Sequence, residues 1–231
     1  MQYKEVVKGR FLSRPNRFIA KVEVDGKEET VHVKNTGRCK ELLTPHCTVY
    51  LSVSDNPNRK TRYDLIAALK ERDSLPALLI NLDSQSPNEA VNQWLPKSGL
   101  FEEDAVIKRE ATYKNSRFDF MITERDRTSY LEVKGVTQER DGVMLFPDAP
   151  TERGVRHIRE LMDAKEADCG AYILFVVQTK GVSHLIPNDE THIEFGKALR
   201  DAEKAGVKII AVDTDVTPDS MVIRDFLPVK L

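Results

Sequence analysis

A hairpin in the middle of the chain carries two carboxylates and an amine at spacings that suit metal-dependent hydrolysis. Residues 116–137 read SRFDFMITERDRTSYLEVKGVT. Successive side chains of a β-strand point to opposite faces, which divides the hairpin into two sides. The predicted apolar side carries Phe118, Phe120, Leu131 and Val133, and the predicted polar side carries Asp119, Glu132 and Lys134.

The pairing of the two strands decides whether these charges meet. With ERDR as the loop, Thr123 pairs with Thr128, and Asp119 lies directly across from Glu132. The Cβ atoms of such a pair are about 5 Å apart, where two like charges destabilise a sheet. A divalent cation removes this conflict, because Mg²⁺ binds one or two carboxylates and keeps several waters. We therefore predict Asp119 and Glu132 as catalytic ligands of Mg²⁺ or Mn²⁺, and Lys134 as the residue that serves the hydrolytic water.

A less specific interpretation of the same residues stays open. In a chain with 31% charged residues, a Glu-x-Lys triplet also arises by chance. A shift of the register by one residue would separate the two carboxylates, and the polar side would be a solvated surface. The surrounding elements favour the metal site, because a helix bearing Glu89 precedes the hairpin and a helix rich in cations follows it.

Two further carboxylates are candidates for the same site. Glu89 lies in the helix predicted from SPNEAVNQWL, and we include it among the predicted catalytic residues. Ser86 and Glu89 also have the spacing of a capping box, which explains Glu89 without catalysis. Glu110 lies in the strand beside that of Asp119 and is a second candidate.

The helix after the hairpin has cations near its start. In FPDAPTERGVRHIREL, Thr151 is the predicted N-cap, and Arg153, Arg156 and His157 occupy the first two turns. Spacings of three and four residues bring such side chains together on a helix. Helix N-termini and arginine forks both suit phosphate oxygens, so we predict that these three residues bind nucleic acid. Surface pairing with neighbouring glutamates is the alternative.

The first third of the sequence consists of short predicted strands. Asp25-Gly26 is a strong signal for a two-residue hairpin turn, and one or two helical turns are expected within residues 35–45. This order predicts an OB-like five-stranded barrel over residues 1–82, a frequent platform for single-stranded nucleic acid. An all-β sandwich fits the strands but gives the helical turns no natural place. The five strands are expected at residues 4–12, 16–24, 27–33, 47–54 and 62–70.

Cations and an aromatic residue gather on this predicted barrel. Cationic grooves with stacking aromatics bind single strands with little sequence preference. Residues 1–82 hold 15 Lys and Arg against 10 Asp and Glu, a net charge of +5, whereas the remainder holds 20 against 27, a net charge of −7. This asymmetry indicates two domains, of which the first contacts a polyanion. The predicted nucleic-acid contacts on the barrel are Arg10, Arg14, Arg17, Phe18, Arg59 and Lys60.

From about residue 83, helices and strands alternate. Helices are expected from Ser86, from Thr151 to about Lys165, and over about 189–205. The order α-β-β-β-α-β-α-β predicts a restriction-endonuclease-like mixed sheet with helices on both faces over residues 83–231. The strands are expected near 105–113, 117–123, 129–135, 171–178, 207–213 and 221–227.

Composition excludes several classes of protein. The 231 residues are 40% hydrophobic, which is ordinary for a globular protein. No apolar run approaches the roughly 20 residues that span a bilayer, and MQYKEVVKGRF has no uninterrupted apolar segment, so we expect no secretory signal there. Three scattered cysteines, Cys39, Cys47 and Cys169, argue against a disulfide framework or a structural zinc site. We expect a cytoplasmic protein with no membrane partner.

The order of elements around the hairpin resembles the PD-(D/E)xK nuclease core. In that core the Asp and the Glu bind Mg²⁺ and the Lys serves the water, and here Phe118 stands where the motif has its proline. More narrowly, the whole chain resembles the sugar fermentation stimulation protein family. The matching stretches are GRFLSRPNRFIAKVEVDG, NTG, SDNPNRK, SRFDF, YLEVKGVT and FPDAPTERGVRHIREL.

This resemblance implies a fold and a function. The fold is an OB-like domain joined to a nuclease-like domain, and the function is DNA binding with a part in regulating sugar (maltose) use. Arg38-Cys39 and TRYDL depart from the pattern on the barrel surface. We expect DNA binding through the phosphate backbone, with RNA as the alternative ligand. Phosphodiester hydrolysis is the sharper hypothesis, a regulator that does not cleave is the third, and the oligomeric state is open.

Overall fold

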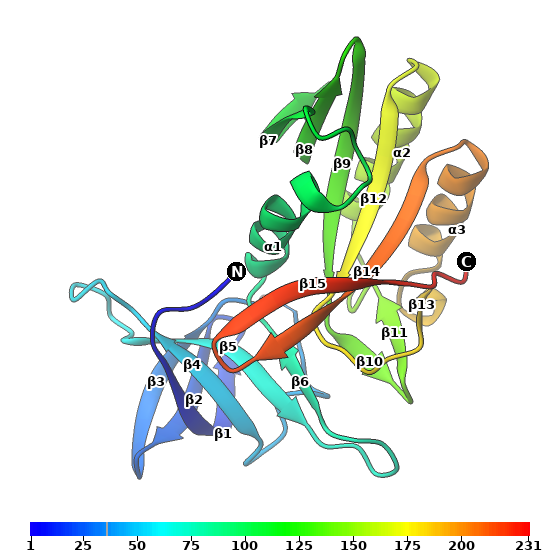
Figure 1. Cartoon of the computed structure of the whole chain (residues 1–231). Helices are drawn as coiled ribbons and strands as arrows, with labels where there is room; N and C mark the ends of the chain where they lie inside the picture. The colour runs from blue at the N-terminus through cyan, green and yellow to red at the C-terminus, as the bar shows by residue number, and fades with distance from the viewer. Residues whose placement is uncertain (36) are drawn as a thin grey trace.

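A closed barrel forms the first part of the chain in the computed structural model, which describes residues 1–35 and 37–231 (Figure 1). Strand β1 pairs with both β2 and β4, and β5 pairs with β4. Parallel pairing between β3 and β5 closes the barrel, which confirms the predicted OB-like fold. The barrel strands are β1 (Val6–Asn16), β2 (Ile19–Val24), β3 (Lys27–Val33), β4 (Thr48–Val53) and β5 (Tyr63–Lys70).

Local sequence signals explain the β2–β3 hairpin. Asp25 and Gly26 both have positive φ angles, 49° and 76°, as a two-residue turn of this kind requires. Ala20, Val22 and Val24 of β2 alternate into the barrel core. The hairpin was therefore predictable from turn chemistry and the period of two.

The segment 35–45, apart from Thr36, which lies outside the described residues, contains a single turn of helical type, within the one or two that were predicted, because the Leu43 N–H donates to the Cys39 carbonyl four residues earlier. One feature of the first part was not predicted. A sixth strand, β6 (Leu78–Asn81), extends the sheet beyond β5. Its side chains Leu78 and Ile80 enter the barrel core.

A mixed six-stranded sheet forms the second part, as predicted (Figure 1). Its order is β15-β14-β12-β9-β8-β7, with β12 parallel to both β9 and β14. The strands are β7 (Val106–Tyr113), β8 (Ser116–Glu124), β9 (Arg127–Val136), β12 (Gly170–Val177), β14 (Lys208–Thr217) and β15 (Ser220–Leu227).

Helices cover both faces of this sheet. Helices α2 (Glu152–Glu166) and α3 (Asp189–Lys204) lie side by side on one face, and α1 (Ser86–Trp94) covers the other (Figure 1). Strand β12 shows the two layers, because Ile173 and Phe175 belong to the core under α2 and α3, whereas Leu174 and Val176 belong to the core under α1.

A small second sheet and a 3-10 turn were not predicted. The sheet has the order β10-β11-β13, and its strands are too short to give a clear alternation. These elements are η1 (Leu95–Lys97), β10 (Gln138–Arg140), β11 (Val143–Phe146) and β13 (His184–Pro187). None of the helices in the described part of the chain has both the length and the apolar composition needed to cross a membrane.

The start of α1 corrects the predicted capping box. Gln85 is the N-cap and its side chain makes no capping hydrogen bond. Ser86 lies inside the helix, where its buried hydroxyl donates to the Asp83 carbonyl and to Asn81. The Ser86 hydroxyl, which the sequence pattern predicted as the helix cap, therefore forms tertiary hydrogen bonds instead.

A buried ion network joins the barrel to the second part. Glu139 of β10 accepts hydrogen bonds from Lys70, at the end of β5, and from Arg72, which follows it. The Gly142 N–H donates to the same carboxylate at 2.6 Å. On the other side of the junction, Lys34 donates to Asp83 at 2.6 Å. Charged pairs thus orient the two parts relative to one another.

Candidate metal and nucleic-acid site

The β8–β9 hairpin has the predicted pairing. Thr123 pairs with Thr128, and Phe120 pairs with Leu131. The strands run further toward the turn than predicted, because Glu124 also pairs with its partner across the hairpin and leaves a two-residue turn. The register of these pairs is the predicted one, but the predicted direct pairing of Asp119 with Glu132 is not formed, because the last pair on that side is Phe120 with Leu131.

The ladder between β8 and β9 ends where the site begins. Phe120 forms the last backbone pair of the ladder. Next to it, the Asp119 side chain replaces a backbone partner, because its Oδ2 accepts the Val133 N–H at 2.7 Å. Glu110 on neighbouring β7 has a φ of 55°, a left-handed conformation that is uncommon for a side chain of this kind. Such local irregularities in strands are frequent next to active sites, where they redirect a side chain.

One prediction about β8 is wrong. Phe118 and Phe120 were expected on the same face, but Phe118 packs in the core under α2 and Phe120 in the core under α1. The alternation therefore reverses at Asp119. The other strand keeps its period, and Leu131 and Val133 share the core under α1 as predicted.

Glu132 has one oxygen fully engaged and one oxygen without a partner. Its Oε1 accepts from Lys134 Nζ at 2.6 Å and lies 2.6 Å from His157 Nδ1. Its Oε2 is buried and has no hydrogen-bond partner among the described residues. A buried carboxylate oxygen without a partner is costly in a folded protein unless a ligand occupies the space beside it.

Asp119 is held in place by two donors from different elements. Asn88 Nδ2, on α1, donates to Oδ1 at 2.7 Å, and the Val133 N–H donates to Oδ2. Burial raises the pKa of Asp119, and the negative charge of Glu132 raises it further. The charge of Glu132 therefore acts on Asp119, and the sharing of a cation by the two carboxylates stays a prediction.

The charge state of Glu132 differs from that of Asp119. Burial alone would raise its pKa, but the hydrogen bond from His157 and the charge of Lys134 outweigh burial and lower the pKa. Glu132 is therefore an ionised carboxylate at neutral pH. An ionised Glu132 beside a carboxyl of raised pKa is the electrostatic pattern that a divalent cation neutralises.

The donor set fits Mg²⁺ or Mn²⁺ bound largely through water. Among residues 1–35 and 37–231, no cluster of three or more His, Cys, Asp and Glu side chains has the geometry of a complete metal site. Asp119 and Glu132 nevertheless supply hard oxygen ligands, and the Oε2 atom of Glu132 has no hydrogen-bond partner among the described residues. Mg²⁺ commonly binds through one or two carboxylates and retains waters.

The other two carboxylate candidates have different partners. Glu89 is half-buried and forms an ion pair with Arg109 at 3.1 Å, and Glu110 lies 3.5 Å from Arg117. In the described structure, neither contacts Asp119 by a hydrogen bond, whereas Asn88 does. Asn88 was missed because its contact depends on the rotation of α1 over the sheet, which the capping-box pattern does not specify.

The start of α2 has the predicted N-cap, but only two of its three predicted phosphate contacts are exposed. The Thr151 hydroxyl accepts from the Gly154 N–H at 3.0 Å. Arg153 and Arg156 are exposed, as phosphate binding requires. His157 corrects the prediction, because it is buried against Glu132 rather than facing nucleic acid. Four residues after Arg153, it turns inward because α2 packs on the sheet at this position.

Several predicted contacts on the barrel have structural partners. Arg14 donates through its two terminal nitrogens to carbonyl oxygens of Arg17, Asn35, Gly37 and Arg38, so it organises the loop after β3. Arg10 pairs with Glu23 at 2.7 Å on the surface.

Three other predicted contacts are open to solvent. Phe18 is 45% exposed, and the Arg17 guanidinium lies 4.7 Å from the centre of its ring. Lys60 is also exposed. An exposed aromatic ring with a stacked guanidinium is suited to contact a nucleotide base and its phosphate.

Arg59 belongs to a partly buried cluster with Asp64. It donates to both carboxylate oxygens, at 2.8 and 2.6 Å, and His32 lies 2.9 Å from the same carboxylate. Burial raises the pKa of Asp64, but the hydrogen bonds from Arg59 and His32 outweigh it and lower the pKa. The cluster therefore stabilises the barrel with Asp64 ionised.

This cluster predicts an acid-sensitive contribution to stability. A carboxyl whose pKa is lowered on folding stabilises the protein above its unfolded pKa and loses that contribution as pH falls through the folded value. We expect the free energy of unfolding to fall between about pH 5 and pH 2, and to fall less steeply in Asp64→Asn. Urea unfolding at a series of pH values measures both slopes. Equal slopes in the two proteins would contradict the assignment.

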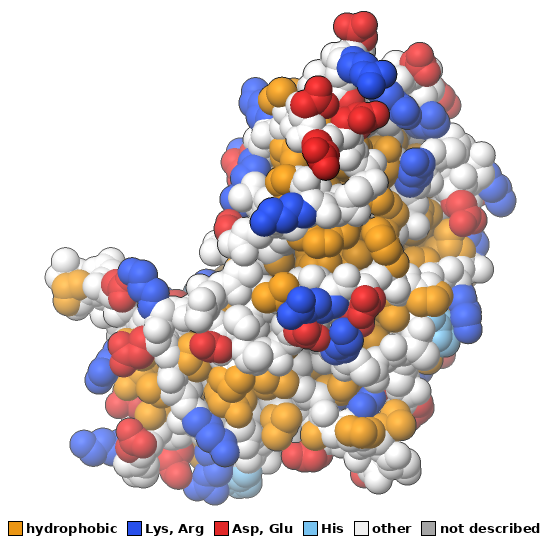
Figure 2. Space-filling view, viewed as in Figure 1, with side chains coloured by type: hydrophobic (Ala, Val, Ile, Leu, Met, Phe, Trp, Pro, Cys, Tyr) orange, Lys and Arg blue, Asp and Glu red, His pale blue; other side chains and the backbone are white. Residues whose placement is uncertain are grey.

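A cationic pocket next to Arg14 adds residues that sequence reasoning missed. It has a volume of about 220 Å³, and Arg17, Arg38 and Lys40 line it together with Asn16. The basic character of the turn after NTG was the available signal. On the face shown in Figure 2, cations are interspersed with acidic side chains, so binding of a polyanion depends on local clusters such as this one.

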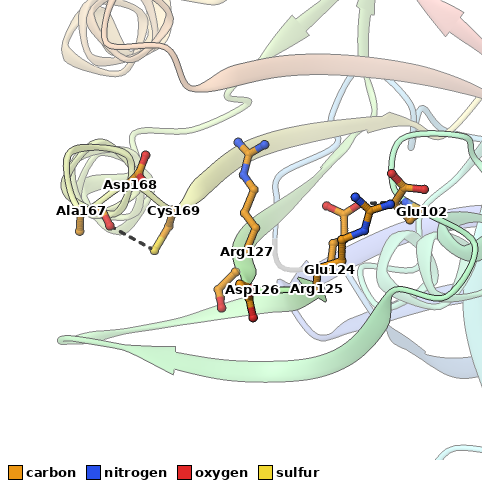
Figure 3. A pocket seen from close by; sticks show the side chains of 9 residues that line it. Glu102, Glu124, Arg125, Asp126, Arg127, Ala167, Asp168 and Cys169 are labelled. Carbon is orange, nitrogen blue, oxygen red and sulfur yellow. Dashed lines mark hydrogen bonds between the residues drawn. The ribbon is translucent and has the colours of Figure 1, made fainter.

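A wider cavity lies at the other end of the hairpin. It has a volume of about 920 Å³ and lies between the β8–β9 turn and the α2–β12 connection (Figure 3). Arg125, Asp126 and Arg127 line one side, and Asp168 and Cys169 line the other. None of the predicted catalytic residues lines it, so it is separate from the candidate site.

Comparison with known proteins supports the two-part description. A family model described as the SfsA N-terminal OB domain matches residues 12–75. A second one, described as the sugar fermentation stimulation protein RE domain, matches residues 85–220. The boundary that we placed after residue 82 stays a prediction.

Individual relatives match over the whole chain. A sugar fermentation stimulation protein homolog of Desulfitobacterium hafniense is 54% identical over 231 residues, covering 100% of this chain and 99% of the relative. One from Clostridium beijerinckii is 52% identical, with 100% of both chains covered. The solved structure of Pyrococcus furiosus SfsA in complex with Ca²⁺ is 27% identical, has a TM-score of 0.87 and covers 100% of this chain and 98% of that one. The chain belongs to the sugar fermentation stimulation protein family.

Proposed function

We propose that this protein binds nucleic acid on its OB-like barrel and hydrolyses phosphodiester bonds at Asp119, Glu132 and Lys134 with Mg²⁺ or Mn²⁺. The observation that carries the proposal is the buried, unpartnered Oε2 of Glu132 beside a second buried carboxylate. A polar surface without a ligand would expose these groups to water instead. DNA is the proposed substrate, and RNA is an outcome that the test distinguishes.

The relative from Pyrococcus furiosus supports a cation site of this kind. That structure is a complex with Ca²⁺. Ca²⁺, like Mg²⁺, takes oxygen ligands and favours carboxylates. We propose that Asp119 and Glu132 of the present chain bind a divalent cation of the same class.

The residues of the chain have separable parts in the proposed reaction. Asn88 and the Val133 N–H hold the Asp119 carboxylate, while Lys134 and His157 engage one oxygen of Glu132. A bound divalent cation would lower the pKa of a coordinated water and offset charge on the phosphate. Lys134 Nζ lies 2.6 Å from Glu132 Oε1 and would orient such a water and accept the proton that the water releases on attack.

Phosphate is held by exposed cations on the second part of the chain. Arg153 and Arg156 lie in the first two turns of α2, on the helix that also supplies His157 to the site. The planar fork of a guanidinium matches two phosphate oxygens. These two residues are the proposed phosphate contacts closest to the chemistry.

Nucleic-acid binding without cleavage is the second candidate function. The cationic pocket with Arg17, Arg38 and Lys40, next to the exposed Phe18 ring, favours it. In this version the protein acts as a DNA-binding regulator of sugar (maltose) use, and the family name points only to sugar fermentation. Affinity should fall steeply with salt, because phosphate contacts release counterions.

The two candidates are tested by nicking of supercoiled plasmid in the presence of Mn²⁺. Cleavage by the wild type is expected, and Asp119→Asn should abolish it while DNA affinity, measured by anisotropy, is retained. Parallel assays with single-stranded DNA and RNA identify the substrate. Binding without cleavage at any Mn²⁺ concentration would leave only the regulator. Absence of binding at low salt would reject both candidates.

A further inference from the structure

We propose that His157 is a positioning residue for Glu132, and that Arg153 holds it in the tautomer with hydrogen on Nδ1. In this arrangement Glu132 presents its Oε2 atom to the cation. The inference rests on the proposed function of Asp119 and Glu132, and adds a chain of contacts from the protein surface to a metal ligand.

His157 occupies a site in which its ring cannot turn freely. It is 2% exposed and lies on α2 between Glu132 and the ring of Phe118. The two rings are 6.0 Å apart and nearly perpendicular, with an interplanar angle of 82°. Packing on one side and the carboxylate on the other leave a single orientation for the imidazole.

Arg153 determines which ring nitrogen carries the hydrogen. Its Nε lies 3.3 Å from His157 Nε2, and a guanidinium nitrogen only donates. Nε2 therefore accepts, and in a neutral imidazole the hydrogen lies on Nδ1. Nδ1 is 2.6 Å from Glu132 Oε1 and donates to it.

Two donors on one oxygen define the orientation of the Glu132 carboxylate. Lys134 Nζ and His157 Nδ1 both point at Oε1, which leaves Oε2 buried and without a partner. Without His157, the carboxylate could rotate and follow the flexible Lys134 side chain. Partners that orient a metal ligand in this way typically change metal affinity by about 10- to 100-fold when they are removed.

The series of contacts from Glu132 through His157 reaches the solvent at Arg153. Arg153 donates to His157 through Nε, and its two terminal nitrogens are available on an exposed side chain. Arg153 can therefore contact a phosphate while it holds the imidazole. The geometry links a phosphate-binding position to the metal ligand through a single ring.

The tautomer is measurable without any metal. Long-range ¹H–¹⁵N NMR of the metal-free wild type at pH 8 should show a protonated Nδ1 and an unprotonated Nε2 for His157. Arg153→Met removes the donor to Nε2 and should give a mixture of tautomers. A wild-type ring protonated at Nε2, or at both nitrogens, would overturn the proposal.

Mn²⁺ affinity tests the consequence for the site. Titration of the full-length protein, followed by the EPR signal of free Mn²⁺, should show at least about 10-fold weaker binding in His157→Leu. His157→Asn places an amide donor near the position of Nδ1, and should recover most of the affinity. This rescue separates positioning from a general effect on packing, and it also covers the outcome in which His157→Leu does not fold.

Arg153 offers a test in which charge and positioning act in opposite directions. Removal of a positive charge near a cation strengthens cation binding by Coulomb's law. If Arg153 positions Glu132 through His157, Arg153→Met should instead weaken Mn²⁺ binding. The matched control is Arg159→Met, which removes an exposed arginine from the same helix. Equal or tighter binding in Arg153→Met would contradict the chain of contacts.

The failure of this inference is distinguishable from the failure of the proposed function. A wild type that does not bind Mn²⁺ rejects the metal site and the inference with it. If the wild type binds and Asp119→Asn does not, the site stands. A His157→Leu protein with wild-type affinity then rejects the role of His157 alone.

Discussion

Replacement of Lys134 by methionine is expected to slow nucleic-acid cleavage by about 10²- to 10⁴-fold, the usual contribution of a positioned acid–base group. Methionine keeps much of the apolar stem of the side chain and removes the amine that lies 2.6 Å from Glu132 Oε1. Glu132 should stay ionised at pH 8, because His157 still donates to it. The measurement is the single-turnover rate with saturating Mn²⁺.

The control for Lys134→Met separates a local role from the loss of one positive charge. Lys204→Met changes an exposed lysine in the last turn of α3, whose only described ion pair is with Asp201. It should cleave at the wild-type rate. Lys134→Met should still bind Mn²⁺, since Asp119 and Glu132 remain. Wild-type cleavage by Lys134→Met would exclude the amine from the reaction, and loss of Mn²⁺ binding would assign it to the metal site instead.

Replacement of Glu139 by alanine is expected to lower the free energy of unfolding by about 3–5 kcal/mol. The Glu139 side chain is 1% exposed, and those of Lys70 and Arg72 are 16% and 8% exposed. Alanine would leave two nearly buried cations without their carboxylate, and removal of one partner of a buried ion network is strongly destabilising. Urea unfolding, followed by circular dichroism and tryptophan fluorescence, measures the change.

An exposed ion pair provides the comparison for Glu139→Ala. The side chains of Lys4 and Asp55 are 83% and 72% exposed, so Asp55→Ala should leave the unfolding midpoint close to that of the wild type. Glu139 also joins β10 to the end of the barrel, so its loss should separate the unfolding of the two parts into two transitions. A single transition with the wild-type midpoint would show that the junction does not depend on this network.

The position of the junction matters for the proposed function. The barrel carries the exposed Phe18 and Arg17, and the second part carries the carboxylates. A nucleic acid held on one part reaches the other only if their relative orientation is maintained. Glu139→Ala should therefore reduce cleavage more than it reduces Mn²⁺ binding at temperatures where the protein is folded.

Much of the fold was predictable because its signals are local. The Asp25-Gly26 turn has the positive φ angles that its residue types favour, and Thr151 caps α2 as its hydroxyl predicted. The Thr123–Thr128 pairing followed from the period of two and a short loop. Each of these features depends on the conformational preference of a few adjacent residues, which the sequence states directly.

Of the candidate site, only the charged residues of the β8–β9 hairpin were predictable from the sequence. The sequence by itself determined that Asp119, Glu132 and Lys134 would lie on adjoining strands, because the register of a hairpin with a short loop is a short-range property. The alternation of β8, which reverses at Asp119, was not predictable in this way. Tertiary structure decided the rest. Asn88 reaches Asp119 from α1, and His157 turns inward to Glu132 because α2 packs on that face of the sheet. These contacts join residues far apart in the chain, so they depend on how helices pack on strands and not on local preference.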